Sequence, residues 1–345
     1  MTNLTERQKL ILALVIRDYI ETAQPVGSQR IVDYYGLDMS SATIRNDMVA
    51  LTEMGFLRQP HTSAGRVPTE EGYRYFVRQL MGNTELPTTT KRTIVHQFYQ
   101  VGPDLDRWMR LAASVLAHQA QAASLVTAPR SEQPRFKHLE LIATRGRQVL
   151  MVLVMGGGEV SQQMLSLAEP VSQEQLSEAA QQLNQVCLGL EPEAISTLRA
   201  QAIGPLEQDI LKLIGDEMHR SNTGLTGELY RDGLTNVLAE PEFGEADVAR
   251  RALRILEERP LLDDLLTRTV LSSEMSGVQV LIGGEGTWEE LRDCSMILAR
   301  YGVPGLVTGT LGVLGPMRMA YGRTISTVRF VSGLLSDLVE DMLLE

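Results

Sequence analysis

The chain has 345 residues, and its 43% hydrophobic and 22% charged residues are typical of a globular protein with a sizeable core. This length predicts two or three domains. The longest apolar run, 149–155, is too short for a membrane-spanning helix. The N-terminus lacks a signal-peptide pattern, and Cys187 and Cys294 lie far apart without metal-ligand spacing, so we expect a cytoplasmic protein.

The net charge of −11 is distributed unevenly along the chain. Residues 1–80 contain nine Lys or Arg and nine Asp or Glu, so the whole acidic excess lies beyond them. An acidic surface is repelled by phosphate groups. If any part of the chain binds nucleic acid, we therefore expect it to be the N-terminal section.

Two helices are expected in the first 36 residues. Thr5 and Gln8 have capping-box spacing, and the apolar residues that follow recur at helical intervals up to residue 20. Proline and glycine at positions 25 and 27 end this helix. Ser28 can cap a second, short helix over 29–35, which Gly36 can end.

A third helix is expected after a tight turn, with Ser40 or Ser41 as its cap and Met54 near its end. Three helices joined in this way predict a helix-turn-helix. The apolar side chains of the third helix lie within about 60° of one another at its 3.6-residue period, and they are Ile44, Met48 and Leu51. This face should pack inward. The side chains expected to point outward are Ala42, Arg45, Asn46, Val49 and Glu53.

The outward face of the third helix has the chemistry of a major-groove reader. Arg45 can donate two hydrogen bonds to guanine, and Asn46 can pair with adenine. Ser41 and Thr43, one turn or less away, could bond phosphates or bases. The alternative is that Arg45 and Asn46 are simply solvated.

A hairpin is expected directly after the third helix, where a winged helix has its wing. The sequence "FLRQ" predicts one strand, "RVPT" its return and "PHTSAG" a tight polar tip. Arg66 could enter a minor groove or hold a phosphate, and His61, Thr62 and Ser63 could donate to phosphate oxygens. A plain exposed hairpin is the alternative. Thr69 then caps another helix.

Residues 40–77, "SSATIRNDMVALTEMGFLRQPHTSAGRVPTEEGYRYFV", closely resemble the winged-helix domain of the HrcA family of bacterial heat-inducible transcription repressors. The upstream "LTERQKLILALVIRDYIETAQPVGS" is similar to the same family, as is the tail "LIGGEG…LRDCSMILARYGVPGLVTGTLGVLGPMRMAYGRTISTVRFVSGLLSDL". Ile31 and Thr52 depart from the pattern, since leucine and glutamate would be expected there. Neither lies on the predicted reading face.

The remaining sequence alternates between helical and strand patterns. Residues 93–123 are helical with a break at "VGPD", 136–160 predict two strands joined at "TRGR", and 172–190 predict a helix, an order that indicates an α+β domain. Residues 192–220 and 245–270 are mostly helical around a strand or hairpin within 226–243. Residues 276–316 return to strand patterns, and a last helix starts at about Met317.

The resemblance implies an α+β multidomain fold: a winged helix-turn-helix, and a GAF-like domain interrupted by a mostly helical dimerizing domain. The bounds expected on this basis are 1–82 for the DNA-binding domain, 83–92 for a linker, 93–194 and 269–345 for the GAF-like domain, and 195–268 for the insertion. The resemblance also implies a homodimer on an inverted-repeat operator, the CIRCE element, ahead of chaperone genes. Regulation by the GroEL chaperonin is implied too.

Other kinds of site find little support in the sequence. The glycine-rich stretches 155–160 and 282–288 contain neither a P-loop nor a dinucleotide motif, and tight turns explain them. The five histidines are scattered without zinc-ligand spacing, and no GxSxG nucleophile motif occurs. We therefore expect no cofactor, metal or catalytic residue. A regulator gated by a small molecule in the GAF-like domain, and an enzyme with a docking winged helix, are the alternatives.

Overall fold

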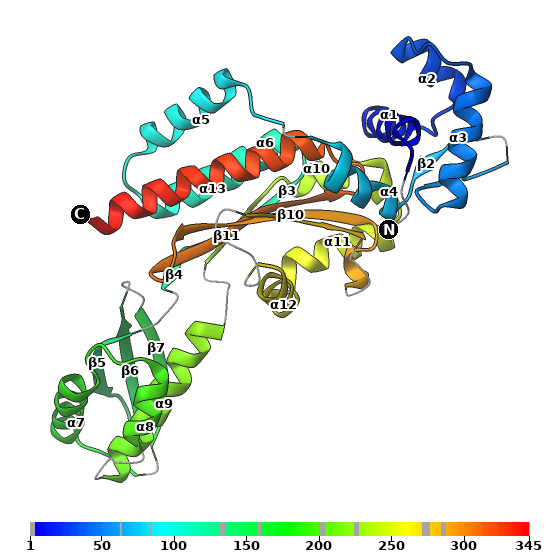
Figure 1. The fold of residues 1–345 in the computed structure, drawn as a ribbon. Coiled ribbons are helices and arrows are strands. Elements are labelled where there is room, and N and C mark those ends of the chain that lie inside the picture. Colours follow the sequence, from blue (N-terminus) through cyan, green and yellow to red (C-terminus); the bar gives the residue numbers. More distant parts are fainter. Residues whose placement is uncertain are drawn as a thin grey trace. The chain divides into compact units, whose positions relative to one another are not determined.

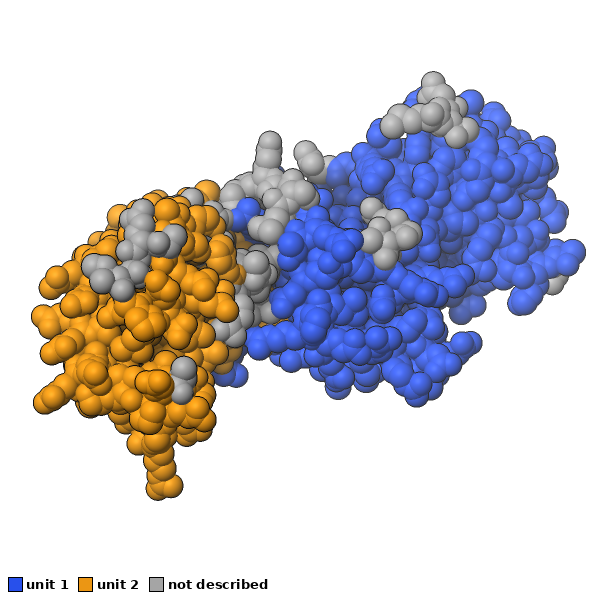
Figure 2. Space-filling view, turned by 90° about the horizontal axis from the view of Figure 1, so that it is seen from below, with its two compact units in different colours: residues 1–126, 230–300, 311–335 blue, residues 127–229, 301–310, 336–345 orange. Residues whose placement is uncertain are grey.

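The computed structural model describes residues 4–62, 64–82, 84–131, 135–156, 160–167, 169–199, 204–223, 228–270, 277–283 and 288–344. The chain divides into two compact units, coloured separately in Figure 2. The first comprises residues 1–126, 230–300 and 311–335, and the second comprises 127–229, 301–310 and 336–345. The mixed α+β architecture expected from the sequence is confirmed (Figure 1).

Three helices form the N-terminal end of the chain: α1 (Glu6–Thr22), α2 (Ser28–Tyr35) and α3 (Ser41–Glu53). The capping box of Thr5 and Gln8 is present at the start of α1, as predicted. The predicted cap of α2 is wrong by one residue, because Ser28 is itself helical and Gly27 occupies the cap position without a side-chain bond. Gly36 ends α2 in the left-handed conformation, with φ 59°, which glycine adopts without steric cost.

The predicted hairpin follows α3 directly. Strand β1 (Leu57–Arg58) pairs antiparallel with β2 (Val67–Pro68), with Leu57 opposite Pro68. Thr69 then caps α4 (Glu70–Tyr75), because its hydroxyl accepts a hydrogen bond from the Gly72 amide. A short π-helix (Phe76–Leu80) continues from α4. Helices and hairpin together form a winged helix-turn-helix.

Two helices follow, α5 (Thr88–Val101) and α6 (Leu105–Ala120). The break between them is at Gly102, inside the "VGPD" stretch where the sequence predicted it. Helix α5 begins within the stretch 83–92 that was expected to be a linker. Its start is physically reasonable because Pro87, at the cap position, has the fixed φ of a helix entry and no amide hydrogen to satisfy.

A six-stranded sheet contains strands from distant parts of the chain, in the order β8-β3-β11-β10-β9, with β4 also paired to β11. Its strands are β3 (Ala123–Thr127), β4 (Arg130–Ser131), β8 (Leu229–Asp232), β9 (Val278–Ile282), β10 (Cys294–Val303) and β11 (Val307–Pro316). The remaining helices of this region are α10 (Leu234–Leu238), a 3-10 turn (Pro241–Phe243), α11 (Ala246–Glu257), α12 (Arg259–Val270), a second 3-10 turn (Glu289–Leu291) and α13 (Tyr321–Leu344). Figure 1 shows α6 and α13 lying along the sheet.

A separate three-stranded antiparallel sheet has the order β5-β6-β7. Its strands are β5 (Phe136–Ala143), β6 (Gln148–Met155) and β7 (Val160–Ser166), and the helices that follow are α7 (Gln173–Cys187), α8 (Pro192–Arg199) and α9 (Pro205–Thr223). Alternate side chains such as Leu139, Met151 and Leu153 are fully buried against residues of these helices, for example Leu176 and Ile214. The hairpin of β5 and β6 was predicted, whereas β7 was missed.

The two sheets divide the chain differently from the expected bounds of 93–194 and 195–268. The last described residue of the six-stranded sheet before the gap is Ser131, and the sheet continues at Leu229. Among the described residues between them, the strands β5, β6 and β7 pair only with one another. The strand β3 was not predicted, because the stretch expected to be helical ended at residue 123 and the residues after it were left unassigned. The domain bounds that the resemblance implies stay a prediction.

Candidate nucleic-acid interface

Helix α3 separates apolar and polar side chains as its sequence predicts. Ile44, Met48 and Leu51 are 0%, 3% and 0% exposed, so this face packs into the core of the winged helix. Arg45 and Asn46 both lie exposed on the other side. Neither side chain forms a hydrogen bond or ion pair within the described parts of the chain, so both side chains are free to contact a ligand.

The first turn of α3 is held by Ser40 rather than Ser41. The Ser40 hydroxyl accepts a hydrogen bond from the Thr43 amide at 3.1 Å and lies 2.9 Å from the Thr43 hydroxyl. Ser41 is the first helical residue and is half-buried. The start of a 13-residue helix also carries unpaired amides and the positive end of the helix dipole, which favour a phosphate.

Two arginine–aspartate pairs hold α2 and α3 against α1. The Arg7 guanidinium donates two hydrogen bonds to Asp47 of α3, at 2.6 and 3.2 Å, and Arg30 of α2 donates to Asp18 of α1 at 2.7 Å. Both carboxylates are nearly sealed from solvent, at 8% and 1% exposure. The hydrogen bond and the charge of Asp47 raise the pKa of Arg7 above its ordinary value. These pairs fix the angle at which α3 presents its outer face.

Sequence reasoning missed these positioning pairs, although one signal was available. Asp47 lies beside Leu51 on the helical wheel, about 40° beyond it at the edge of the inward face of α3, and an unpaired carboxylate buried there would be costly. A partner was therefore required. Its identity depends on how α1 crosses α3, which periodicity does not reveal.

The wing is attached to the helices by its backbone. Val26, in the loop between α1 and α2, exchanges two backbone hydrogen bonds of 2.9 Å with Arg66. Gly65 is required at this crossing, because a Cβ there would lie 2.4 Å from the Val26 carbonyl oxygen. Gln59 braces the tip by donating to the carbonyls of Thr62 and Ala64.

Arg66 lies at the base of the wing and not at its tip. Its Nε donates to the Thr52 hydroxyl of α3 at 3.0 Å, and the side chain is half-buried. Thr52 is the position where the family pattern led us to expect glutamate, so a residue that departs from the pattern contacts the wing. At the tip, His61 and Thr62 are exposed, and Ser63 lies outside the described residues.

The described residues offer little to other kinds of ligand. No three His, Cys, Asp or Glu side chains among them are grouped so as to hold a metal ion. None of the helices in the described ranges combines the length and apolarity needed to cross a membrane.

The chain is similar to proteins of one family along almost its whole length. Residues 3–82 match "Winged helix-turn-helix transcription repressor, HrcA DNA-binding", and residues 106–325 match "HrcA protein C terminal domain". The heat-inducible transcription repressor HrcA of Roseiflexus castenholzii is 47% identical, with 99% of this chain and 96% of that protein covered. The same repressor of Herpetosiphon aurantiacus is 44% identical and that of Thermomicrobium roseum 42%, each with 98% of this chain and 96% of the relative covered.

A solved structure also has the same fold. The crystal structure of a hypothetical protein superposes with a TM-score of 0.62 at 23% identity, covering 98% of this chain and 99% of that one. At this level of identity the likeness concerns the fold alone.

Proposed function

We propose that this chain, which belongs to the HrcA family of heat-inducible transcription repressors, acts as a cytoplasmic homodimer on an inverted-repeat operator, the CIRCE element, ahead of chaperone genes. As a member of this family it is a DNA-binding regulator and not an enzyme. The observation that carries the proposal is the outer face of α3, where Arg45 and Asn46 are exposed without partners inside a winged helix. Two such helices related by a twofold axis would read a palindrome.

In this proposal the site residues divide between bases and backbone. Arg45 and Asn46 read base edges in the major groove, and Ser41 and Thr43 hold the adjacent phosphates. The tip residues His61, Thr62 and Ser63 contact the sugar–phosphate backbone. For Arg66, the bond from Nε to Thr52 leaves the two Nη groups to reach a phosphate beside the wing, which favours backbone contact over base readout.

The surface that we propose for the homodimer is the open face of the sheet β5-β6-β7. One face of this sheet packs on the helices, and the other carries rows of apolar side chains across the strands. The exposed members Ile142, Val160 and Met164 are 45%, 53% and 52% accessible, and the half-buried members between them are Leu150, Val152 and Val154. An exposed apolar sheet face of this kind normally marks a surface that binds another protein. We accordingly propose residues 132–228 as the dimerizing insertion and the six-stranded sheet with its helices as the GAF-like domain.

This dimer surface is tested by a charge at its centre. Val152→Glu should turn the dimer into a monomer in sedimentation velocity and weaken operator binding, because one buried carboxylate per subunit has no partner. Val186→Glu, on an exposed part of α7 in the same region, is the matched control and should leave the dimer intact. A Val152→Glu protein that remains dimeric would exclude this surface.

We further propose that the GroEL chaperonin sustains the operator-binding state and that heat removes it. Support comes from the family resemblance. The proposal predicts that repressor solubility and operator binding fall with temperature and that purified chaperonin restores both. Recovery without chaperonin would argue against it.

The DNA-binding function is tested by footprinting on a duplex that carries an inverted repeat. The wild type should protect both half-sites symmetrically. Asn46→Ala should lose this protection at concentrations where a surface control, Glu178→Ala on α7, retains it. Equal protection by Asn46→Ala would remove α3 from base recognition.

A further inference from the structure

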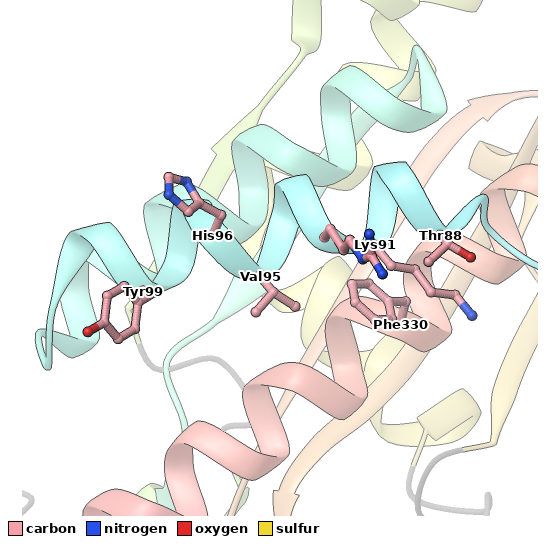
Figure 3. A pocket seen from close by; sticks show the side chains of 7 residues that line it. Thr88, Lys91, Val95, His96, Tyr99 and Phe330 are labelled. Atoms are coloured by element: carbon pink, nitrogen blue, oxygen red, sulfur yellow. The ribbon is translucent and has the colours of Figure 1, made fainter.

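Apolar side chains are exposed in more than one part of the first unit. A groove of about 410 Å³ lies between α5 and α13 (Figure 3), where Val95, Tyr99 and Phe330 are apolar and Lys91 is basic. This mixed lining does not select one class of ligand. Val49 of α3 is also exposed, at 39%, and it lies among side chains whose chemistry does select one.

Val49 lies between the two proposed base-reading residues on the surface of α3. At about 100° per residue, it is about 40° from Arg45 and about 60° from Asn46, and it is the neighbour of both at the four- and three-residue spacings of a helix. Ala42, one turn before them on the same face, is exposed as well. These side chains therefore form one continuous surface, in which an apolar part lies beside hydrogen-bonding groups.

Val49 contributes little to the stability of the free chain. The core face of α3 is formed by Ile44, Met48 and Leu51 instead. A β-branched residue lowers helix propensity, and an isopropyl group in contact with water gains nothing from burial. Within α3, whose residues are all described, Val49 is the one large apolar side chain that is exposed. Its chemistry therefore suits a partner that covers it when α3 is bound.

We propose that Val49 contacts the C5-methyl group of a thymine in the operator, so that α3 recognises this base through an apolar contact beside its hydrogen bonds. This inference rests on the proposed function, because it requires α3 to lie in the major groove. The thymine methyl is the apolar group that base pairs present in that groove, and apolar side chains recognise it. Asn46 can pair with adenine, whose partner is thymine, so an A·T pair at this site presents a methyl group in the same groove.

The spacing along α3 places this thymine close to the base that Asn46 reads. Val49 is about 4.5 Å further along the helix axis than Asn46, at about 1.5 Å per residue, and stacked base pairs are about 3.4 Å apart. We therefore expect the thymine within two base pairs of the adenine.

Valine is well suited to this contact. Its χ1 angle is largely fixed in a helix, so the contact costs little side-chain entropy. Cytosine in place of the thymine would lack the methyl group, and its N4 amino group would face the isopropyl group without an acceptor. The contact therefore distinguishes thymine from the other pyrimidine.

The contact is tested by replacing thymine with deoxyuridine, which removes the methyl group and leaves every hydrogen-bonding group in place. Each thymine of an inverted-repeat duplex is replaced in turn, at the equivalent positions of both half-sites, and the affinity of the full chain is measured at one salt concentration. For the wild type, one replacement should weaken binding about fourfold per half-site, because one buried methyl group is lost. Val49→Ala should bind the thymine duplex more weakly and should lose this sensitivity to deoxyuridine. Alanine has the higher helix propensity, so α3 stays folded in this variant.

The matched control is Leu10→Ala, which removes a 45% exposed apolar side chain from α1 and should keep the full sensitivity to deoxyuridine. A wild type that is insensitive to deoxyuridine at every thymine would overturn the proposal, as would a Val49→Ala protein with the sensitivity of the wild type. In either case, loss of the footprint in Asn46→Ala would leave the proposed function standing. If Asn46→Ala and Val49→Ala both bind the operator as the wild type does, base recognition by α3 fails together with this proposal.

Discussion

Replacing Arg7 with alanine should destabilise the winged helix more than replacing Asp47 with asparagine, although both remove the same pair. The reason is the unequal exposure of the partners: the Arg7 side chain is 54% exposed and that of Asp47 only 8%. Arg7→Ala leaves a carboxylate buried without its counter-charge, for which we expect about 3 kcal/mol. Asp47→Asn leaves an arginine that water can solvate, and its lost hydrogen bonds should cost about 1 kcal/mol.

Hydrogen exchange of the α3 amides in the full chain measures this difference, because it reports local stability in a multidomain protein. Three kcal/mol corresponds to exchange that is roughly 100-fold faster, and one kcal/mol to roughly fivefold. Lys9→Ala is the control, since its partner Glu6 is 89% exposed and that surface pair should contribute almost nothing. Equal acceleration by Arg7→Ala and Asp47→Asn, or the reverse order, would refute the reasoning.

Three further predictions concern the wing, the recognition helix and one surface ion pair. Gly65→Ala should destabilise the wing by about 1–3 kcal/mol and weaken operator binding, because its Cβ would lie 2.4 Å from a backbone carbonyl; Gly27→Ala, with nothing within 4 Å, should not. Ser40→Ala should destabilise α3 by about 1 kcal/mol through loss of its cap, seen as faster amide exchange confined to that helix. The hydrogen bond from Arg254 holds the pKa of Glu258 below its ordinary value of 4.5. The pair therefore stabilises the fold above pH 4.5, and this stabilisation is lost as the pH falls through the lowered pKa. In Arg254→Gln, NMR titration should return the pKa of Glu258 toward 4.5, and an unchanged value would contradict the assignment.

The local structure of the winged helix was predictable because its signals are short-range. The capping box at Thr5, the apolar spacing of Ile44 and Leu51, and the polar hairpin all depend on residues within a few positions of one another. The anchoring of Arg66 was not predictable. It depends on Val26 and Thr52, which come into reach only when the three helices have packed.

The domain organisation was harder to predict because it depends on strand pairing between distant segments. Leu125 of β3 pairs with Gly312 of β11, almost two hundred positions away, and no local pattern indicates such a partner. The strand β7 was missed for a different reason: its inward positions Ser161 and Gln163 are polar and its outward position Met164 is apolar, so its alternation is weak. The resemblance to HrcA implies an insertion, and the strand pairing is what supports the proposed bounds of 132–228.

The central claim is that the outer face of α3 reads bases while the wing holds the backbone. It is tested most directly by measuring operator affinity for Arg45→Ala and Arg66→Ala on duplexes with single base-pair changes, at several salt concentrations. Arg45→Ala should lose about 1–3 kcal/mol and stop discriminating at one position of each half-site. Arg66→Ala should weaken binding evenly on all duplexes and make the salt dependence shallower. Identical base profiles and identical salt slopes for the two variants would contradict the account.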